Sequence, residues 1–397
     1  MRERKALPSR PVRWLLCPFL WSNRNVGRTG QRRIRRNGED ERQAHGVRPG
    51  HIWIARVQQA FPAFYHRTDL QGRGRAFAAD SAHRIQAVET AAPDGRPGTS
   101  FSIFVTQRRA PRFSVIVPIY EQWHLLCALM ERLAEQTLAH DEFEIIVVDN
   151  GSVAVRPELV SLPNAQLLHS LGFGSYAARN EGARRACGEW LVFTDADCLP
   201  ERDWLDCMAR AAQQGENASS LLAGAVEMRA SSPSPSSFEI YDLLKGIPQA
   251  RYVKRGYAAT ANLAVPRLVF EQLGGFDNTR LSGGDADFCR RAGAAGFPIR
   301  YVPQARVGHP ARTSWADIVT KARRIKGGQL RSGSRRRRLA WAIRTMLPPV
   351  CGAWLFLRRR DKPLNHRVLA TIVLFLLWFV EVWELFRLLT GRKAERR

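Results

Sequence analysis

The feature that most limits how this chain can fold is an alternation of two kinds of segment between Phe113 and Arg229. Short apolar runs have the composition of strands that are buried on both faces. They lie at 113–120, 144–152, 165–170, 190–197 and 221–229. Helix-length stretches lie between most of them, at 123–138, 173–188 and 203–215, and the first has apolar residues at three- and four-residue spacing. This alternation predicts βαβ crossovers and an α/β fold with a mainly parallel central sheet.

The distribution of charge argues against a nucleic-acid-binding protein. The 397 residues carry a formal net charge of +25, which by itself resembles a nucleic-acid binder. Residues 1–104, however, hold 19 basic and 8 acidic residues, and residues 305–397 hold 22 and 5. The central part, 105–304, is left with 20 basic and 23 acidic residues, so the predicted α/β domain is slightly acidic. We therefore expect no nucleic-acid partner.

The two ends of the chain differ from the centre. Residues 1–104 are rich in Arg, Gly and Pro without a helical or strand period, which favours a disordered extension or a gene-model artefact over a functional tail. Residues 311–397 combine arginine clusters at 335–338 and 358–360 with the apolar stretch 368–389, about long enough to cross a bilayer. Seven scattered cysteines without a C-x-x-C pair favour a reducing, cytosolic setting.

We expect this C-terminal segment to attach the protein to the cytoplasmic face of the cell membrane. Glu381, Glu384 and Arg387 recur at three-residue spacing within the apolar stretch. That mixture suits either a helix lying in the membrane interface or a span that faces other helices, and the sequence leaves both open.

Carboxylates gather where ligands bind in open α/β sheets, at the carboxyl ends of the strands. Asp149 follows one predicted strand, Asp195 and Asp197 follow another, and Asp285 and Asp287 come after a Gly-Gly pair. Two carboxylates one residue apart repel each other unless they share a cation. They are the oxygen ligands that Mg²⁺ or Mn²⁺ takes, with positions left open for phosphate oxygens. The sequence thus predicts a divalent-cation site at Asp195 and Asp197.

Five segments occur together, in order, in the central half of the chain. They are FSVIVPIYE, IIVVDNGS, AARNEGARRACGEWLVFTDAD, GGFD and SGGDADFCRRAGAAGF. Over residues 112–310 the chain resembles the family-2 glycosyltransferases, which implies an inverting enzyme with a nucleotide-binding domain of the glycosyltransferase-A type. We expect this catalytic domain at 111–310, followed by a basic helical and hydrophobic membrane-associating segment at 311–397.

The resemblance also implies roles for single residues. Asp285 would be the general base, with Asp287 as its rival, because Gly284 stands where many relatives carry Glu. Asp197 would hold the metal, and His309 would lie near it. Donor-binding positions would be Pro118, Tyr120, Glu121, Asp149, Arg179, Asp195, Gly283 and Gly284.

The expected reaction is metal-dependent inverting transfer of a sugar, of the hexosyltransferase type. The donor would be a nucleotide sugar, with a lean to uridine diphosphate, and the acceptor a cell-surface glycan or its lipid-linked precursor. A cation neutralises the leaving diphosphate, and one carboxylate activates the acceptor hydroxyl. The alternative is a sugar-phosphate nucleotidylyltransferase. That enzyme needs a Gly-rich basic loop after the first strand, and PIYEQWH is not one.

Overall fold

The computed structural model describes residues 85–89, 101–105, 110–214, 219–392 and 394. Most of the Arg-rich extension predicted at 1–104 lies outside these residues, so its nature stays a prediction. The described part of that region consists of β1 (Ile85–Glu89) and β2 (Phe101–Val105), which pair antiparallel with Ile85 opposite Val105.

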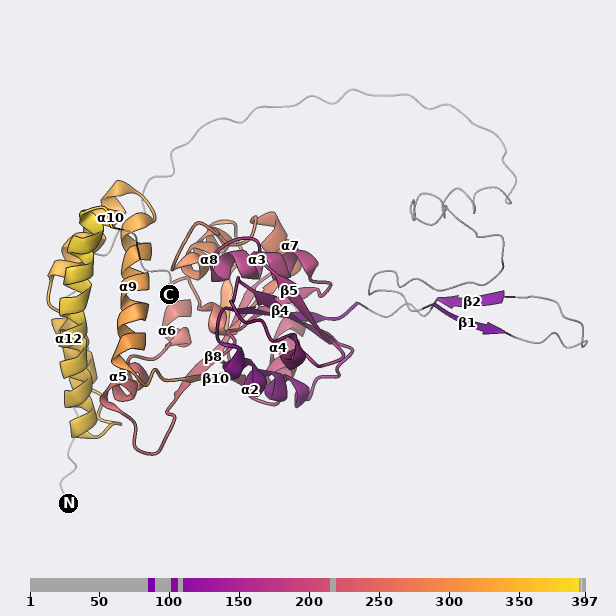
Figure 1. The fold of residues 1–397 in the computed structure, drawn as a ribbon, viewed down its shortest axis with the longest axis horizontal. Helices are drawn as coiled ribbons and strands as arrows, with labels where there is room; N and C mark the ends of the chain where they lie inside the picture. The colour runs from indigo at the N-terminus through magenta and orange to yellow at the C-terminus, as the bar shows by residue number, and fades with distance from the viewer. Residues whose placement is uncertain (1–84, 90–100, 106–109, 215–218, 393, 395–397) are drawn as a thin grey trace, which may run out of the picture. The chain divides into compact units, whose positions relative to one another are not determined.

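An eight-stranded sheet organises the rest of the chain (Figure 1). Its order is β5 (Ala165–His169), β4 (Phe143–Asp149), β3 (Phe113–Ile119), β6 (Trp190–Phe193), β9 (Leu263–Pro266), β8 (Leu221–Arg229), β10 (Ile299–Pro310) and β7 (Leu199–Pro200). The β5-β4-β3-β6 half is entirely parallel, and β10 is parallel to β8. Strands β9 and β7 run antiparallel to their neighbours. The expected α/β fold with a mainly parallel sheet is confirmed.

Helices cover both faces of the sheet, as the continuous apolar runs predicted. Successive residues of a strand point to opposite faces. Val115 and Val117 accordingly pack in one core with α2 (Trp123–Ala134) and α4 (Trp204–Gln213). Ile116 points into a second core with α3 (Ser175–Arg185), α7 (Arg267–Gln272) and α8 (Gly284–Ala294). A short 3₁₀ turn, η1 (Pro157–Leu159), precedes β5.

A helical layer is formed by one helix between β8 and β9 and by the helices that follow β10. It consists of α5 (Ser237–Lys245), α9 (Trp315–Arg331), α10 (Arg335–Met346), α11 (Val350–Leu357) and α12 (Leu364–Leu389). A third apolar cluster joins α5, α9, α11 and α12, with Tyr241, Ile318 and Val373 among its members. The short elements α6 (Gln249–Val253) and η3 (Thr260–Asn262) connect α5 to β9.

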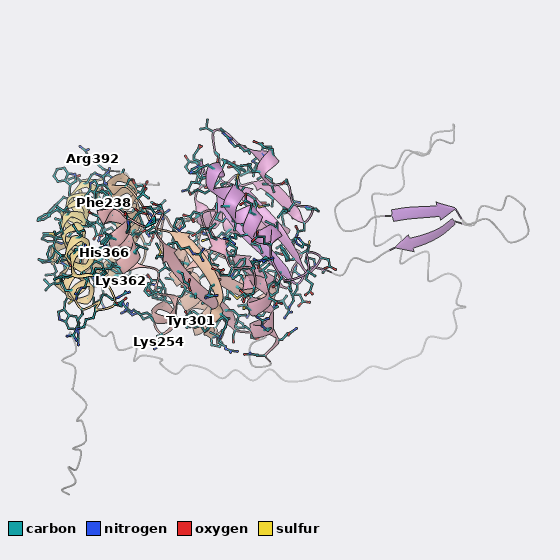
Figure 2. The ribbon with its side chains drawn as sticks, turned by 90° about the horizontal axis from the view of Figure 1, so that it is seen from below. Phe238, Lys254, Tyr301, Lys362, His366 and Arg392 are labelled. Atoms are coloured by element: carbon teal, nitrogen blue, oxygen red, sulfur yellow. The ribbon has the colours of Figure 1, made fainter. Side chains whose placement is uncertain are left out.

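Helix α12 carries the predicted apolar stretch. Among the described residues it is the single unbroken helix that is long and apolar enough to cross a membrane. Helices α10 and α11 pass the same test only together, and they meet at a bend of 60°. The helix runs alongside α9 (Figure 1), and Lys362 and Arg392 lie just beyond its two ends (Figure 2).

Candidate active site

Asp149 ends β4 and is buried. Its carboxylate accepts backbone hydrogen bonds from Gly151 (3.1 Å) and Ser152 (3.2 Å), and it lies 3.5 Å from His169 Nδ1. Glu121 braces the same loop, since its Oε1 accepts from Val153 N at 2.7 Å. Asp149 therefore shapes the turn after β4, which is the local role that Asp often has in turns.

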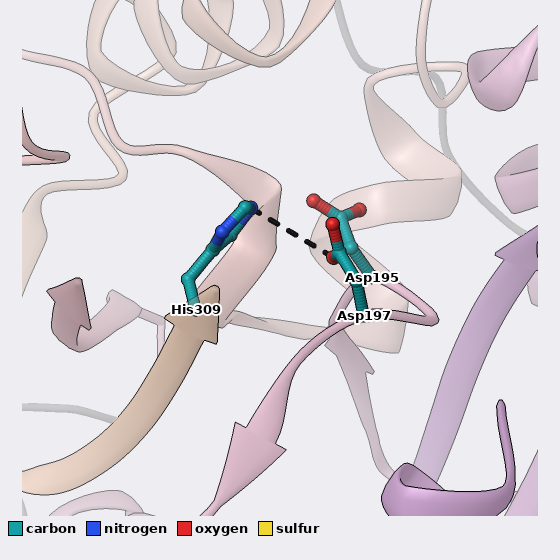
Figure 3. Close-up of side chains that lie close together, drawn as sticks. All are labelled: Asp195, Asp197 and His309. Carbon is teal, nitrogen blue, oxygen red and sulfur yellow. Dashed lines mark ion pairs between the residues drawn. The ribbon is translucent and has the colours of Figure 1, made fainter. Parts of the chain in front are cut away.

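Asp195 and Asp197 lie directly beyond β6, and His309 lies near the end of β10 (Figure 3). Each of the three offers one ligand atom, and these atoms lie within 4.8 Å of one another. His309 Nε2 is 3.7 Å from Asp197 Oδ1. His309 Nδ1 is 2.9 Å from the Pro310 carbonyl, which can only accept, so Nδ1 carries a proton and Nε2 is the nitrogen that the neutral imidazole offers to a cation.

This triad fits a divalent cation. Asp197 Oδ1 is buried and accepts no hydrogen bond from any residue that the structure describes. A buried carboxylate oxygen without a partner is costly, and a hard cation is the partner that two carboxylates and an imidazole suit. The sequence brought Asp195 and Asp197 together by adjacency, whereas the 112-residue separation to His309 is bridged only by the sheet, through β10.

Arg179, on α3, forms a close ion pair with Asp195. Burial disfavours the charged form of Asp195, but the Arg179 guanidinium, with His309 and Arg324, outweighs it and lowers the pKa of that carboxyl. Asp195 is thus held ionised beside the triad.

Asp285 lies in the first turn of α8, not at a strand end as the sequence pattern suggested. Tyr176 OH donates to its carboxylate at 3.4 Å, and burial raises the pKa of Asp285. The same phenol explains Gly284, because a Cβ at that position would lie 2.8 Å from the Tyr176 ring. The preceding Gly283 adopts φ +74°, a conformation that favours glycine.

Asp287 has a different environment. Its two oxygens pair with Arg280 at 2.8 Å and with Arg291 at 3.2 Å. Arg291 in turn donates to the Leu273 carbonyl at 2.5 Å, so the network ties α8 to the loop after α7. Asp287 is therefore engaged in a structural ion-pair network.

A cavity of about 570 Å³ collects many of these groups. Seven of the predicted site residues line it: Pro118, Arg179, Asp195, Asp197, Gly283, Asp285 and His309. The other five, Tyr120, Glu121, Asp149, Gly284 and Asp287, do not belong to its lining. A second hollow of about 810 Å³ adjoins it and shares Arg280, Leu281, Gly328 and Ser332.

Arg179 was predicted, but the sequence pattern missed most of the other basic residues of this cavity. Lys245, Arg312, Lys321 and Arg324 line it from the end of α5, the connection after β10 and α9. Arg312 and Lys321 belong to the segment expected to serve the membrane. Only the proximity of Arg312 to His309 in VGHPART hinted at this role.

Comparisons with known proteins show which family the chain resembles. Residues 114–259 match the family model "Glycosyl transferase family 2", and residues 190–387 match "Glycosyl transferase family group 2". Glycosyltransferase AglE of Haloferax volcanii is 31% identical over 228 residues, which are 55% of this chain and 73% of that protein. Pre-mycofactocin glycosyltransferase of Mycobacterium tuberculosis is 30% identical over 45% of this chain, but the match spans only 39% of its length.

Among solved structures, the chain is similar to a mannosyltransferase from Pyrobaculum calidifontis in complex with GDP-Man and Mn²⁺. The TM-score is 0.46 and the identity 20%, over 69% of this chain and 88% of that one. S. aureus TarS 1–349 in complex with UDP-GlcNAc gives a TM-score of 0.40 at 18% identity, with the same two coverages.

Proposed function

Because the chain belongs to the family-2 glycosyltransferases, we propose that it transfers a sugar from a nucleotide-sugar donor with inversion at the anomeric carbon. The observation that carries the proposal is the triad of Asp195, Asp197 and His309 at the cavity that Asp285 also lines. Family membership does not favour the nucleotidylyltransferase alternative or a nucleic-acid binder.

The donor end of the cavity is proposed at the triad. Asp197 and His309 hold a divalent cation, Mn²⁺ or Mg²⁺, which when bound supplies positive charge for the leaving diphosphate. Arg179 keeps Asp195 ionised and adds a further positive charge there. Asp149 holds the turn after β4, which we propose contacts the nucleotide of the donor. Uridine diphosphate is the nucleotide that we favour.

Asp285 is proposed as the general base. Its carboxyl lines the cavity, and its raised pKa brings it nearer the working pH, where a base transfers protons most efficiently. Asp287 is committed to Arg280 and Arg291, which favours Asp285 over its rival. A single base suffices because one in-line attack by the acceptor hydroxyl inverts the anomeric centre.

Donor screening tests this proposal. Thermal stability is measured with a panel of nucleotide sugars and nucleoside diphosphates, each with Mn²⁺ and with EDTA, since a bound donor stabilises the fold by mass action. We expect one donor class to stabilise the wild type only with the metal, and to leave Asp197→Asn unchanged. Full metal-dependent sugar transfer by Asp197→Asn contradicts the assignment.

The acceptor is proposed to be a cell-surface glycan or its lipid-linked precursor, reached at the cytoplasmic face of the membrane. Large apolar side chains are exposed along one stripe of α12: Val368, Ile372, Leu376, Phe379, Trp383, Phe386 and Leu389. Leu339, Ile343 and Trp354 add to this surface from α10 and α11. Arginines at 335–338 and 358–360 flank it, and such clusters attract anionic lipid.

Flotation with vesicles tests the membrane proposal. We expect the wild type to float with vesicles that contain anionic phosphatidylserine. A Phe379→Ser/Trp383→Ser double variant should bind these vesicles less and remain at the bottom of the gradient. Leu268→Ser is the matched control, because Leu268 is at least as exposed as Phe379 and Trp383 but lies on α7. Equal flotation of all three proteins would show that the exposed stripe of α12 does not attach the protein to the membrane.

A further inference from the structure

Among the described residues, eight Lys and Arg side chains line the cavity. Four of them come from α5, α9 and the connection before α9, and we call these the basic wall: Lys245, Arg312, Lys321 and Arg324. They come from three places in the chain, namely the end of α5, the connection after β10 and one turn of α9. The wall adjoins the triad, since Arg324 acts electrostatically on both Asp195 and Lys321.

The basic wall holds more positive charge than its own carboxylate neutralises. Asp242 forms ion pairs with Arg312 (3.0 Å) and Lys321 (3.8 Å), and Lys245 Nζ contacts the Tyr241 hydroxyl at 3.0 Å. Burial and the nearby charges of Arg312, Lys245 and Arg324 lower the pKa of Lys321 to about 7, despite Asp242. Like charges crowded inside a cavity are the arrangement expected of an anion-binding surface.

The donor does not account for this surplus. A metal-bound diphosphate beside Asp195 and Asp197 leaves about two negative charges, which Arg179 and Arg324 balance. Lys245, Arg312 and Lys321 against Asp242 then leave about 1.5 to 2 positive charges, since Lys321, with its pKa of about 7, is only partly protonated near neutral pH until an anion binds. That is close to the charge of a phosphate monoester, roughly −1.5 to −2 at neutral pH.

We propose that the basic wall binds a phosphate group of the acceptor, so that the acceptor is a phosphorylated molecule. This inference rests on the proposed function, because it assigns the triad to the donor. The phosphate belongs either to a lipid phosphate or to a soluble phosphorylated glycan. Helix α9 links the wall to α12, since Lys326 pairs with Glu381 of α12 at 3.0 Å. Because the opposite stripe of α12 is proposed to contact the membrane, the lipid is the first source to test.

The experiment measures two kinds of binding to the purified full chain by calorimetry. Donor-type binding is measured with UDP and GDP plus Mn²⁺. Acceptor-type binding is measured in EDTA with farnesyl phosphate, inorganic phosphate and glucose 6-phosphate, and with farnesol as the uncharged control. The variants are Lys321→Gln, Lys245→Gln and Lys321→Arg, which keeps the charge. Lys254→Gln is the matched control, because Lys254 is exposed and does not line the cavity (Figure 2).

We expect farnesyl phosphate to bind the wild type without metal, and farnesol not to bind. Each Lys→Gln change in the wall should weaken phosphate binding at least about tenfold, the amount that one charged hydrogen bond supplies. Binding of the nucleoside diphosphate with Mn²⁺ should stay within about twofold, Lys321→Arg should retain most phosphate binding, and Lys254→Gln should change neither.

Other outcomes decide between the sources or overturn the inference. Glucose 6-phosphate binding as tightly as farnesyl phosphate assigns the wall to a soluble phosphorylated acceptor. Equal weakening of UDP or GDP binding by Lys321→Gln assigns the wall to the donor and overturns the inference, as does a wild type that binds none of the phosphates in EDTA. Phosphate binding without any metal-dependent UDP or GDP binding refutes the proposed function instead.

Discussion

Replacing Asp197 by Asn removes one negative charge from the triad and keeps the size of the side chain. The carboxylate oxygens of Asp195 and Asp197 lie within 4.8 Å of each other. At an effective dielectric constant of about 20, two unit charges at that distance repel by about 3 kcal/mol. Arg179 offsets part of this by pairing with Asp195. Without metal, the variant should therefore be as stable as the wild type or up to about 2 kcal/mol more stable.

With metal the order reverses. A cation at a hundred times its dissociation constant stabilises the wild type by about 2.7 kcal/mol. For a domain of this size each kcal/mol shifts the melting temperature by about 2–4 °C, so the wild type should gain about 5–10 °C. Asp197→Asn loses one of three ligands and the charge that attracts the ion, and its gain should fall below about 2 °C.

The assay is thermal unfolding of both proteins in EDTA and in a MnCl₂ series, followed by transfer activity with the donor found by screening. Asp206→Asn is the matched control, because Asp206 pairs with Arg210 on the surface of α4 and does not line the cavity. A variant that is clearly less stable in EDTA and keeps the full Mn²⁺ shift would refute the cation site, since Asp197 would then be a structural carboxylate.

Further predictions concern the base, its titration and the core. Asp285→Asn should lower kcat by about 10²–10⁴ and leave donor binding unchanged. Asp287→Asn should lower the melting temperature, because it breaks the ion pairs with Arg280 and Arg291, and should keep kcat within about tenfold. The opposite pattern would assign the base to Asp287. Burial raises the pKa of Asp285, and the base acts only when ionised, so kcat should fall as pH drops through that raised pKa, above the range of an ordinary Asp. An acid limb at an ordinary Asp pKa would exclude Asp285. Asn262→Ala should lower the free energy of unfolding, measured in urea, by about 2–4 kcal/mol. The buried Asn262 side chain accepts a hydrogen bond from Trp204 Nε1 (2.9 Å) and donates to the carbonyls of Ala225 (2.8 Å) and Ala305 (2.9 Å). A loss under about 1 kcal/mol would refute this prediction.

The buried strands of the parallel half of the sheet could be predicted from sequence. Runs such as 113–120 are almost wholly apolar because both faces of the strand pack against helices, and this pattern can be recognised in the sequence. Strand β9 was missed because Leu263–Pro266 has only four residues and runs antiparallel to its two neighbours. Strand β6 is equally short, but the carboxylates that follow it mark its end in the sequence, and β9 has no such mark.

The basic wall shows a second limit. Lys321 is one charged residue among many in a basic segment, and its position in the cavity follows from the packing of α9 beside α5. Ion pairs fix α9 in turn, since Glu384, fully buried on α12, lies 3.8 Å from Arg323. The segment expected to associate with the membrane thus also lines the candidate active-site cavity.

The same packing bears on how α12 meets the membrane. Its acidic side chains face α9, while its opposite stripe is apolar and exposed. If α12 crossed the bilayer, α9 alongside it would place Lys321, Arg323 and Lys326 in the hydrocarbon, at about 2.5–3.5 kcal/mol for each. A helix that lies in the interface avoids this cost and keeps the cavity wall in water. We therefore favour attachment to the surface over a span.

The Asp-Ala-Asp sequences at 195–197 and 285–287 are identical but place their carboxylates differently. The first follows β6 in a turn, and both of its carboxylates converge with His309. The second lies in the first turn of α8, where residues two apart point about 200° away from each other. Asp285 and Asp287 therefore cannot serve one site. The helix directs Asp285 to the cavity and Asp287 to Arg280 and Arg291, and so separates the proposed base from its rival.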